Sequence, residues 1–250
     1  MNENIVTAPA APAAAAVEPP RRPLASPLHT AVLVLVAVAV SLAGSSSVGA
    51  SIARHGRIRT YAFTIAYELV LLGWVWLGIR RRGESIRRLI AGRWKTPEDF
   101  LLDLAIAAGY WIVAIAVLAG LSFALGLAGQ AQADAAKKTL FALAPSTRPE
   151  LALFIALSCV AGFIEEVVFR GYLQRQFAAL CGGSAVIGIV ASGIVFGLSH
   201  GYEGARRMVV IAVYGILFGV LAYWRKSLRP GMIAHAWHDV ISGLALRLLK

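Results

Sequence analysis

Two carboxylates and a guanidinium lie within one apolar stretch of this chain. Glu165, Glu166 and Arg170 occur in a run that is otherwise apolar enough for a membrane helix. Ionisable side chains are costly inside a bilayer, and they usually mark a functional site. Glu166 and Arg170 are one helical turn apart, which favours an ion pair, whereas Glu165 points about 140° away from Arg170. We therefore expect Glu166 to be structural and Glu165 to be a general base.

A plain structural network of these three side chains is the alternative, but two acids and one base leave a negative charge that needs another partner. His200 lies in a later apolar run, one turn after Phe196. Glu165 lies 17 residues before Gly182, and His200 lies 18 residues after it. An antiparallel hairpin that turns at Gly182 would place the acid and the imidazole at matched depth.

The last apolar run contains His235, His238 and Asp239. His235 and Asp239 are one turn apart, so the carboxylate could orient the imidazole or act beside it as a ligand. His238 is rotated by about 60° from His235, and we expect it to point elsewhere. We expect one cavity in which Glu165, His200 and His235 share a water. Straight helices would place His235 and His200 at different depths, so this cavity needs tilted helices or different helix ends.

The composition is that of a polytopic membrane protein. Of the 250 residues, 58% are hydrophobic and 15% charged, and the mean hydropathy is +0.71; soluble domains have about 25% charged residues. The net charge of +11 comes from bases between the apolar runs, as the positive-inside rule describes. We expect a lipid bilayer as partner, a membrane-associated peptide or protein as substrate, and no nucleic acid.

The apolar runs predict an all-α transmembrane bundle of about seven spans. We expect a disordered cytoplasmic tail over 1–27 and a helical membrane domain over 28–250, with its catalytic core at about 150–245. The first apolar run is nearly long enough to span and follows a long tail, which favours a retained anchor over a cleaved signal peptide. The expected helices cover about 28–50, 60–79, 100–126, 150–171, 185–200, 207–224 and 230–248.

The loops predict an orientation. Residues 80–99 contain seven bases, so this loop and the N-terminus are expected in the cytoplasm, with loops 51–59 and 127–149 outside. Residues 172–182 mix polar and apolar side chains and are expected to extend the fourth helix along the membrane surface.

Together these residues resemble the CAAX protease and bacteriocin-processing (CPBP, or Abi) family. Its signature is E-E-x-x-x-R, then F-x-x-x-H, then H-x-x-x-N/D. All three motifs match in order, over roughly residues 150–245: Glu165-Glu166 with Arg170, Phe196 with His200, and His235 with Asp239.

The resemblance implies a membrane-embedded endopeptidase. In it Glu165 would activate water, His200 would assist, and His235 with Asp239 would stabilise the oxyanion, supported by Glu166, Arg170 and Phe196. Asp239 can donate a hydrogen bond only when protonated, unlike an Asn, so His235 is the stronger oxyanion donor.

Zinc is the open question about cofactors. Glu165, His200 and His235 would suit a His₂Glu zinc site with an open position for water. However, the chain lacks H-E-x-x-H, the resemblance implies direct activation of water by glutamate, and a tightly bound ligand is a poor free base. We expect metal-independent hydrolysis without a cofactor, and zinc on those three residues is the alternative.

Three functions fit the sequence. The first is an intramembrane endopeptidase that cuts near the cytoplasmic face; the second is a non-catalytic scaffold or bacteriocin-immunity protein that binds a peptide in the same cavity. A proton-coupled transporter is third, but it predicts repeated halves, which the sequence does not show. The Ala- and Arg-rich composition indicates a multi-pass protein of a bacterial inner or plasma membrane, for which a prenylated substrate is not expected.

Overall fold

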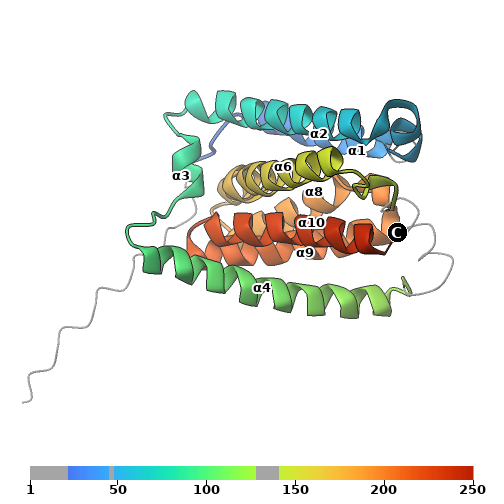
Figure 1. Ribbon diagram of the computed structural model, residues 1–250. Coiled ribbons are helices and arrows are strands. Elements are labelled where there is room, and N and C mark those ends of the chain that lie inside the picture. Colours follow the sequence, from blue (N-terminus) through green and yellow to red (C-terminus); the bar gives the residue numbers. More distant parts are fainter. Residues whose placement is uncertain (1–21, 45–47, 128–140, 250) are drawn as a thin grey trace, which may run out of the picture.

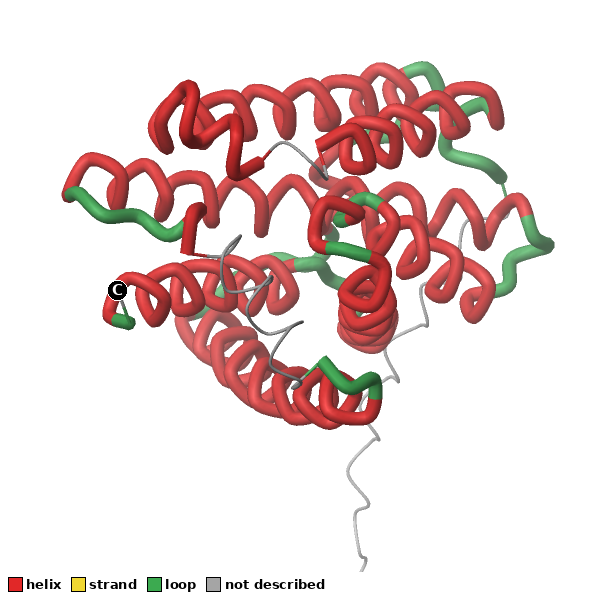
Figure 2. Tube along the Cα trace, turned by 90° about the vertical axis from the view of Figure 1, so that its right-hand side faces the viewer, coloured by secondary structure: helices red, strands yellow, loops and turns green. Residues whose placement is uncertain are grey.

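The described residues form an all-α bundle. The computed structural model describes residues 22–44, 48–127 and 141–249, which contain helices and no strands. The long helices run side by side in alternating directions (Figure 1). The view turned by 90° shows the same helices joined by loops (Figure 2). The predicted fold class is therefore confirmed.

A helix lies at each of the seven predicted positions. The described residues also form two short helices that were not predicted, Ile86–Ile90 and Gly201–Glu203. The helices of the bundle are α1 (Pro27–Gly44), α2 (Val48–Arg80), α3 (Ile86–Ile90), α4 (Pro97–Ala124), α6 (Arg148–Glu165), the π-helical η1 (Glu166–Leu173), α7 (Gln174–Leu180), α8 (Ala185–Leu198), the short 3₁₀ helix η2 (Gly201–Glu203), α9 (Ala205–Arg225) and α10 (Arg229–Leu248).

Four helical segments are long and apolar enough to cross a membrane: Ser51–Arg80, Pro97–Ala124, Arg148–Leu180 and Ala205–Arg225. Helices α1 and α8 are apolar but shorter. Helix α10 has 20 residues but is less apolar because it carries the histidines and the aspartate of the third motif. The protein is thus a multi-pass membrane protein.

Capping residues determine where several helices begin. Thr96 and Thr147 each accept a hydrogen bond from the backbone N–H three residues later, and Asp99 and Glu150 return a bond to the backbone N–H of the cap. Such capping boxes satisfy N–H groups that the first turn leaves unpaired. Gly182 and Gly183, with φ of 67° and 87°, turn the chain between α7 and α8 in a conformation that favours glycine.

The expected loop at 51–59 is wrong. Helix α2 begins at Val48 and kinks at Gly56, where φ is 77° and ψ is 163°. The apolar criterion missed this segment because its bases and small residues interrupt the hydrophobic run. Most of the expected outer loop 127–149 lies outside the described residues.

Residues 172–182 do extend the fourth helix, but the expectation that they lie along the membrane surface is wrong. Gln174, Gln176 and Ala178 are buried. The Gln176 side chain donates to the carbonyl of Ala25 at 2.9 Å and accepts from the N–H of Leu24 at 2.6 Å. Polar residues in this segment therefore anchor the chain that leads into α1, instead of facing lipid headgroups.

The bundle has two distinct ends. The α3 end contains α3, the start of α7 and the start of α10, since Arg175 reaches the carbonyl of Arg88 and Arg229 reaches that of Ala91. The η2 end contains η2 and the last turn of α10, where Arg247 reaches the carbonyl of Thr147. Helix α8 runs from the α3 end to the η2 end. Its Gly197 has no side chain, which lets α8 approach Met208 and Ala212 of α9 closely.

Candidate active site

The predicted ion pair lies at the centre of the bundle. Arg170 Nη1 is 3.0 Å from Glu166 Oε1, and both side chains are almost completely buried. Both residues belong to η1, a π-helical segment, and such segments are rare and often found at functional sites. Glu166 thus makes the ion pair with Arg170 that its expected structural role requires.

Aromatic rings enclose Arg170. Its guanidinium carbon is 4.2 Å from the ring centre of Phe196 and 5.0 Å from that of Phe218. Arg170 Nη2 donates to the carbonyl of Gly215 at 3.2 Å. A cation between ring faces is stabilised electrostatically, so Arg170 connects η1 to α8 and α9. Phe196 has the expected supporting position.

His235 contacts both adjacent acids. Its Nδ1 is 3.1 Å from Glu166 Oε1, and its Nε2 is 3.6 Å from Glu165 Oε2. Carboxylate oxygens only accept hydrogen bonds, so a proton on each ring nitrogen satisfies both contacts. Helix α10 reaches this position because Gly162 of α6 faces Ala236, whose backbone nitrogen would lie 2.7 Å from an added Cβ.

Glu166 therefore takes the role that we considered for Asp239. The carboxylate that orients the His235 ring comes from η1, across the helix–helix contact, and not from the next turn of α10. Asp239 lines the cavity beside the histidine. The i,i+4 spacing did not identify this partner because a contact between helices has no regular spacing in sequence.

His200 lies two residues after the end of α8 and directly precedes η2. Its Nδ1 lies 2.8 Å from the carbonyl oxygen of Phe196, which only accepts, so Nδ1 carries the proton in this contact and Nε2 is left for other chemistry. The Phe196 ring centre is 4.7 Å from that of His200 and 6.0 Å from that of His235. Phe196 thus contacts both imidazoles, which approach the site from different helices.

One cavity of about 590 Å³ joins these groups. It extends from the middle of the bundle to the η2 end. His235 and His200 can therefore both line it although they lie at different depths. It is lined by all four predicted catalytic residues: Glu165, His200, His235 and Asp239.

His238 lines the same cavity, contrary to our expectation that it would point elsewhere. Its ring centre is 5.1 Å from that of Tyr214. The 60° offset between His235 and His238 is small compared with the width of the cavity, so both side chains reach it. Of these two histidines, only His235 has an ion-pair contact with Glu165 or Glu166 among the described residues.

Glu68, which was not among the predicted site residues, is a buried carboxylate on α2 that lines the cavity together with Glu165. The signal was present, because an acid in the apolar run 60–79 meets the criterion that identified Glu165. Tyr202 and Glu203 of η2 and Tyr214 of α9 also line the cavity. These have no distinctive spacing in the sequence.

The described residues contain no group of three or more His, Cys, Asp or Glu side chains placed to hold a metal ion. Glu165, His200 and His235 share the cavity without converging on one point. The geometry therefore does not fit the zinc alternative, and metal-independent hydrolysis stays a prediction.

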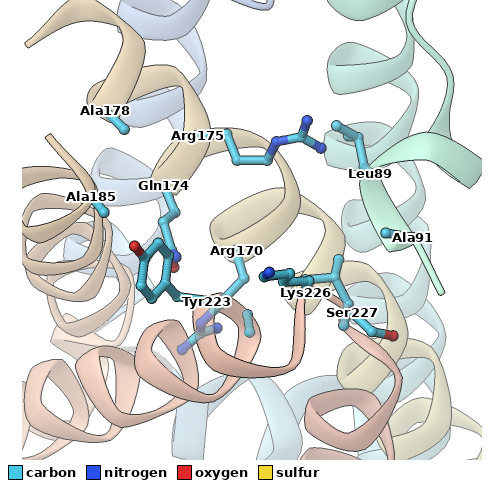
Figure 3. Close-up of a pocket in the computed structure, with 12 residues that line it drawn as sticks. Leu89, Ala91, Arg170, Gln174, Arg175, Ala178, Ala185, Tyr223, Lys226 and Ser227 are labelled. Carbon is cyan, nitrogen blue, oxygen red and sulfur yellow. The ribbon is translucent and has the colours of Figure 1, made fainter. Parts of the chain in front are cut away.

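A second cavity, of about 80 Å³, lies at the α3 end. Figure 3 shows Arg170 and Gln174 between its walls, with Arg175, Lys226 and Ser227 around them. Arg170 also forms the ion pair with Glu166, so this side chain lies between the small cavity and the candidate active site. The small cavity contains none of the predicted catalytic residues.

The part of the chain that contains this site matches a known protein family. Residues 147–241 match the family described as type II CAAX prenyl endopeptidase Rce1-like. No curated protein and no solved structure was found to match the chain. The matched range begins at the N-cap of α6 and contains every residue of the three motifs. The resemblance drawn from those motifs is thus confirmed: residues 147–241 of this multi-pass membrane protein are similar to type II CAAX prenyl endopeptidases.

Proposed function

We propose that this protein is an intramembrane endopeptidase that hydrolyses peptide bonds of membrane-associated peptides or proteins. The observation that carries the proposal is the different setting of two adjacent acids. Glu166 contacts Arg170 at 3.0 Å and His235 at 3.1 Å, whereas Glu165 borders the cavity and has only the longer contact of 3.6 Å with His235. A carboxylate in this position can bind and deprotonate a water.

The reaction begins when Glu165 removes a proton from water and the hydroxide oxygen attacks the peptide carbonyl carbon. Negative charge develops on the carbonyl oxygen, where the N–H at His235 Nε2 donates to it. Glu165 then returns the proton to the amide nitrogen as the C–N bond breaks. The products are a new carboxylate and a free amine.

Glu166 and Arg170 support this step without touching the reacting atoms. Glu166 accepts from His235 Nδ1 at 3.1 Å and so directs Nε2 toward the cavity. Arg170 holds the Glu166 carboxylate in place through the ion pair at 3.0 Å. His200 assists through Nε2, since its Nδ1 is bonded to the carbonyl of Phe196. The bacterial plasma membrane is the proposed location, on the basis of the Ala- and Arg-rich composition.

Membrane proteomics tests the proposal. Peptide termini are compared between cells that express the wild type and cells that express Glu165→Gln at equal level. We expect a set of termini that occur only with the wild type. If wild-type and Glu165→Gln cells have the same peptide termini, the endopeptidase proposal fails. If the two kinds of cell also have the same phenotype, the protein acts as a scaffold or immunity factor.

A further inference from the structure

Glu68 is a buried acid that the proposed mechanism does not use. Its residue is 5% exposed, and its Oε2 atom has no hydrogen-bond partner. It lies in Ser51–Arg80, a segment apolar and long enough to span a membrane. An ionised carboxylate without a partner is costly in such a setting, so a bound cation would let Glu68 be ionised at much lower cost.

Glu68 lies where two cavities meet. Besides the cavity of about 590 Å³, a cavity of about 310 Å³ lies among α1, α2, α6 and η2. Glu68, Glu165, His200 and Tyr202 line both. Glu165 also lies near enough to Glu68 for their charges to interact. A ligand of Glu68 is therefore next to the proposed site of hydrolysis.

The described residues around these cavities do not supply the missing positive charge. No Lys or Arg is among those that line the smaller cavity. Among those that line the larger cavity, Arg207 pairs with Glu203 at 3.4 Å, and His235 contacts Glu165 and Glu166. Glu68 and Asp239 border the same cavity without an ion pair among the described residues. The surplus charge is negative, so it favours a cation.

A metal ion does not fit this place, because the described side chains form no group that could ligate one. An organic cation needs fewer ligands and can reach one carboxylate from a distance. The smaller cavity is otherwise largely apolar, with Val40, Phe63 and Leu71 in its wall. A long aliphatic stem with a charged end matches an apolar wall that has a carboxylate at one point.

We propose that Glu68 is a specificity-determining residue that binds a lysine or arginine side chain of the substrate peptide, next to the bond that is cut. This rests on the proposed endopeptidase function and adds the substrate class to it. The ammonium or guanidinium donates to Glu68 in a charge-assisted hydrogen bond. The stem of the side chain lies in the smaller cavity, and the peptide carbonyl faces Glu165.

The first test is cleavage of a peptide library by the purified protein in lipid nanodiscs, read by mass spectrometry. The library has fixed apolar flanks and one variable position, scanned along the peptide. We expect the wild type to cut peptides with Lys or Arg at one fixed distance from the cut about tenfold faster than peptides with norleucine there. Glu68→Gln should cut both at equal rates. Glu84→Gln, the same change at the α3 end, should keep the preference.

The second test measures binding and does not depend on cleavage. Fluorescent peptides that differ only by lysine or norleucine are titrated against wild type, Glu68→Gln and Glu84→Gln. We expect about tenfold tighter binding of the lysine peptide to wild type and Glu84→Gln, and equal binding of both peptides to Glu68→Gln. If this pattern appears without any cleavage, the endopeptidase proposal fails and the cation site stands. If wild type shows no preference in either test, or Glu68→Gln keeps it, the cation site is overturned.

Discussion

Glu165 and Glu166 are chemically identical neighbours that the fold separates by their contacts. Glu166 is enclosed and binds both Arg170 and His235, whereas the side chain of Glu165 is 14% exposed and borders the cavity. Removing one partner of a buried ion pair leaves the other charge uncompensated. Replacing Glu165 removes only the longer contact of 3.6 Å with His235, whose ring keeps its contact with Glu166. The two acids should therefore respond differently to the same substitution.

Glu166→Gln should lower the stability of the protein by about 3–5 kcal/mol, because Arg170 is left buried without its counter-ion. Glu165→Gln should change stability by less than about 1 kcal/mol and abolish activity. Thermal and denaturant unfolding in detergent, together with a cleavage assay, give both values. Unchanged stability in both variants would contradict the assignment of roles.

His235→Ala should lower kcat/KM by about 10²–10³-fold, the usual cost of removing an oxyanion donor. His238→Ala should cost only a few fold, because His238 makes no contact with either acid among the described residues. Steady-state kinetics on one substrate give the comparison. A larger loss for His238 than for His235 would show that the wrong histidine had been chosen.

Activity should survive thorough chelation, and purified active protein should contain far less than one zinc per chain. The reason is that Glu165 has to stay free to act as a base. Elemental analysis and assays before and after chelation measure this. Stoichiometric zinc, with activity lost on chelation and restored by zinc, would establish the metal mechanism instead.

Among the elements, the long helices could be predicted because an apolar run of spanning length has few other structures in a membrane. The Glu166–Arg170 pair could also be predicted, since it depends on one helical turn. The π-helical form of η1 and the contact of His235 with Glu166 could not, because they arise from packing between helices. Glu68 could have been found by the criterion applied to Glu165, and it was overlooked.

The approach of α10 to α6 depends on Gly162. In Gly162→Ala the added Cβ would lie 2.7 Å from the backbone nitrogen of Ala236, so the helices must separate and the contact between His235 and Glu166 lengthens. We expect lower stability and at least about tenfold lower activity, as small displacements of catalytic groups are costly.

Gly109→Ala on α4 is the matched control, because an added Cβ there meets no atom within 4 Å. It should keep full activity and stability, since alanine is the better helix former. Thermal unfolding and cleavage assays compare the stability and the activity of Gly162→Ala with those of Gly109→Ala. Equal behaviour of the two would contradict the role of close packing at Gly162.

For the whole molecule, the structure connects the orientation of the chain to the location of the site. The large cavity extends to the η2 end, whereas the seven bases of residues 80–99 lie at the α3 end. If the substrate enters at the η2 end, a cytoplasmic 80–99 loop predicts entry from the side of the membrane opposite the cytoplasm, and not the expected cleavage near the cytoplasmic face. The basic loop is the better-founded of the two, because it rests on the positive-inside rule.

A reporter fused to the C-terminus tests this orientation, because α10 ends at the η2 end. With residues 80–99 in the cytoplasm, alkaline phosphatase fused there should be active in a bacterial host and a fluorescent protein fused there should be dark. Fusions within the loop 80–99 should give the opposite pattern. A fluorescent, phosphatase-negative C-terminus would place the cavity on the cytoplasmic side.

The central claim is that Glu165 activates a water that cleaves a peptide bond. The most direct measurement is cleavage of an identified substrate in ¹⁸O-labelled water, with mass spectrometry of the products from wild type and Glu165→Gln at matched folding and substrate binding. The account predicts one ¹⁸O in the new C-terminal carboxylate with the wild type, and no product with Glu165→Gln. Labelled product formed by Glu165→Gln at a rate near that of the wild type would contradict it.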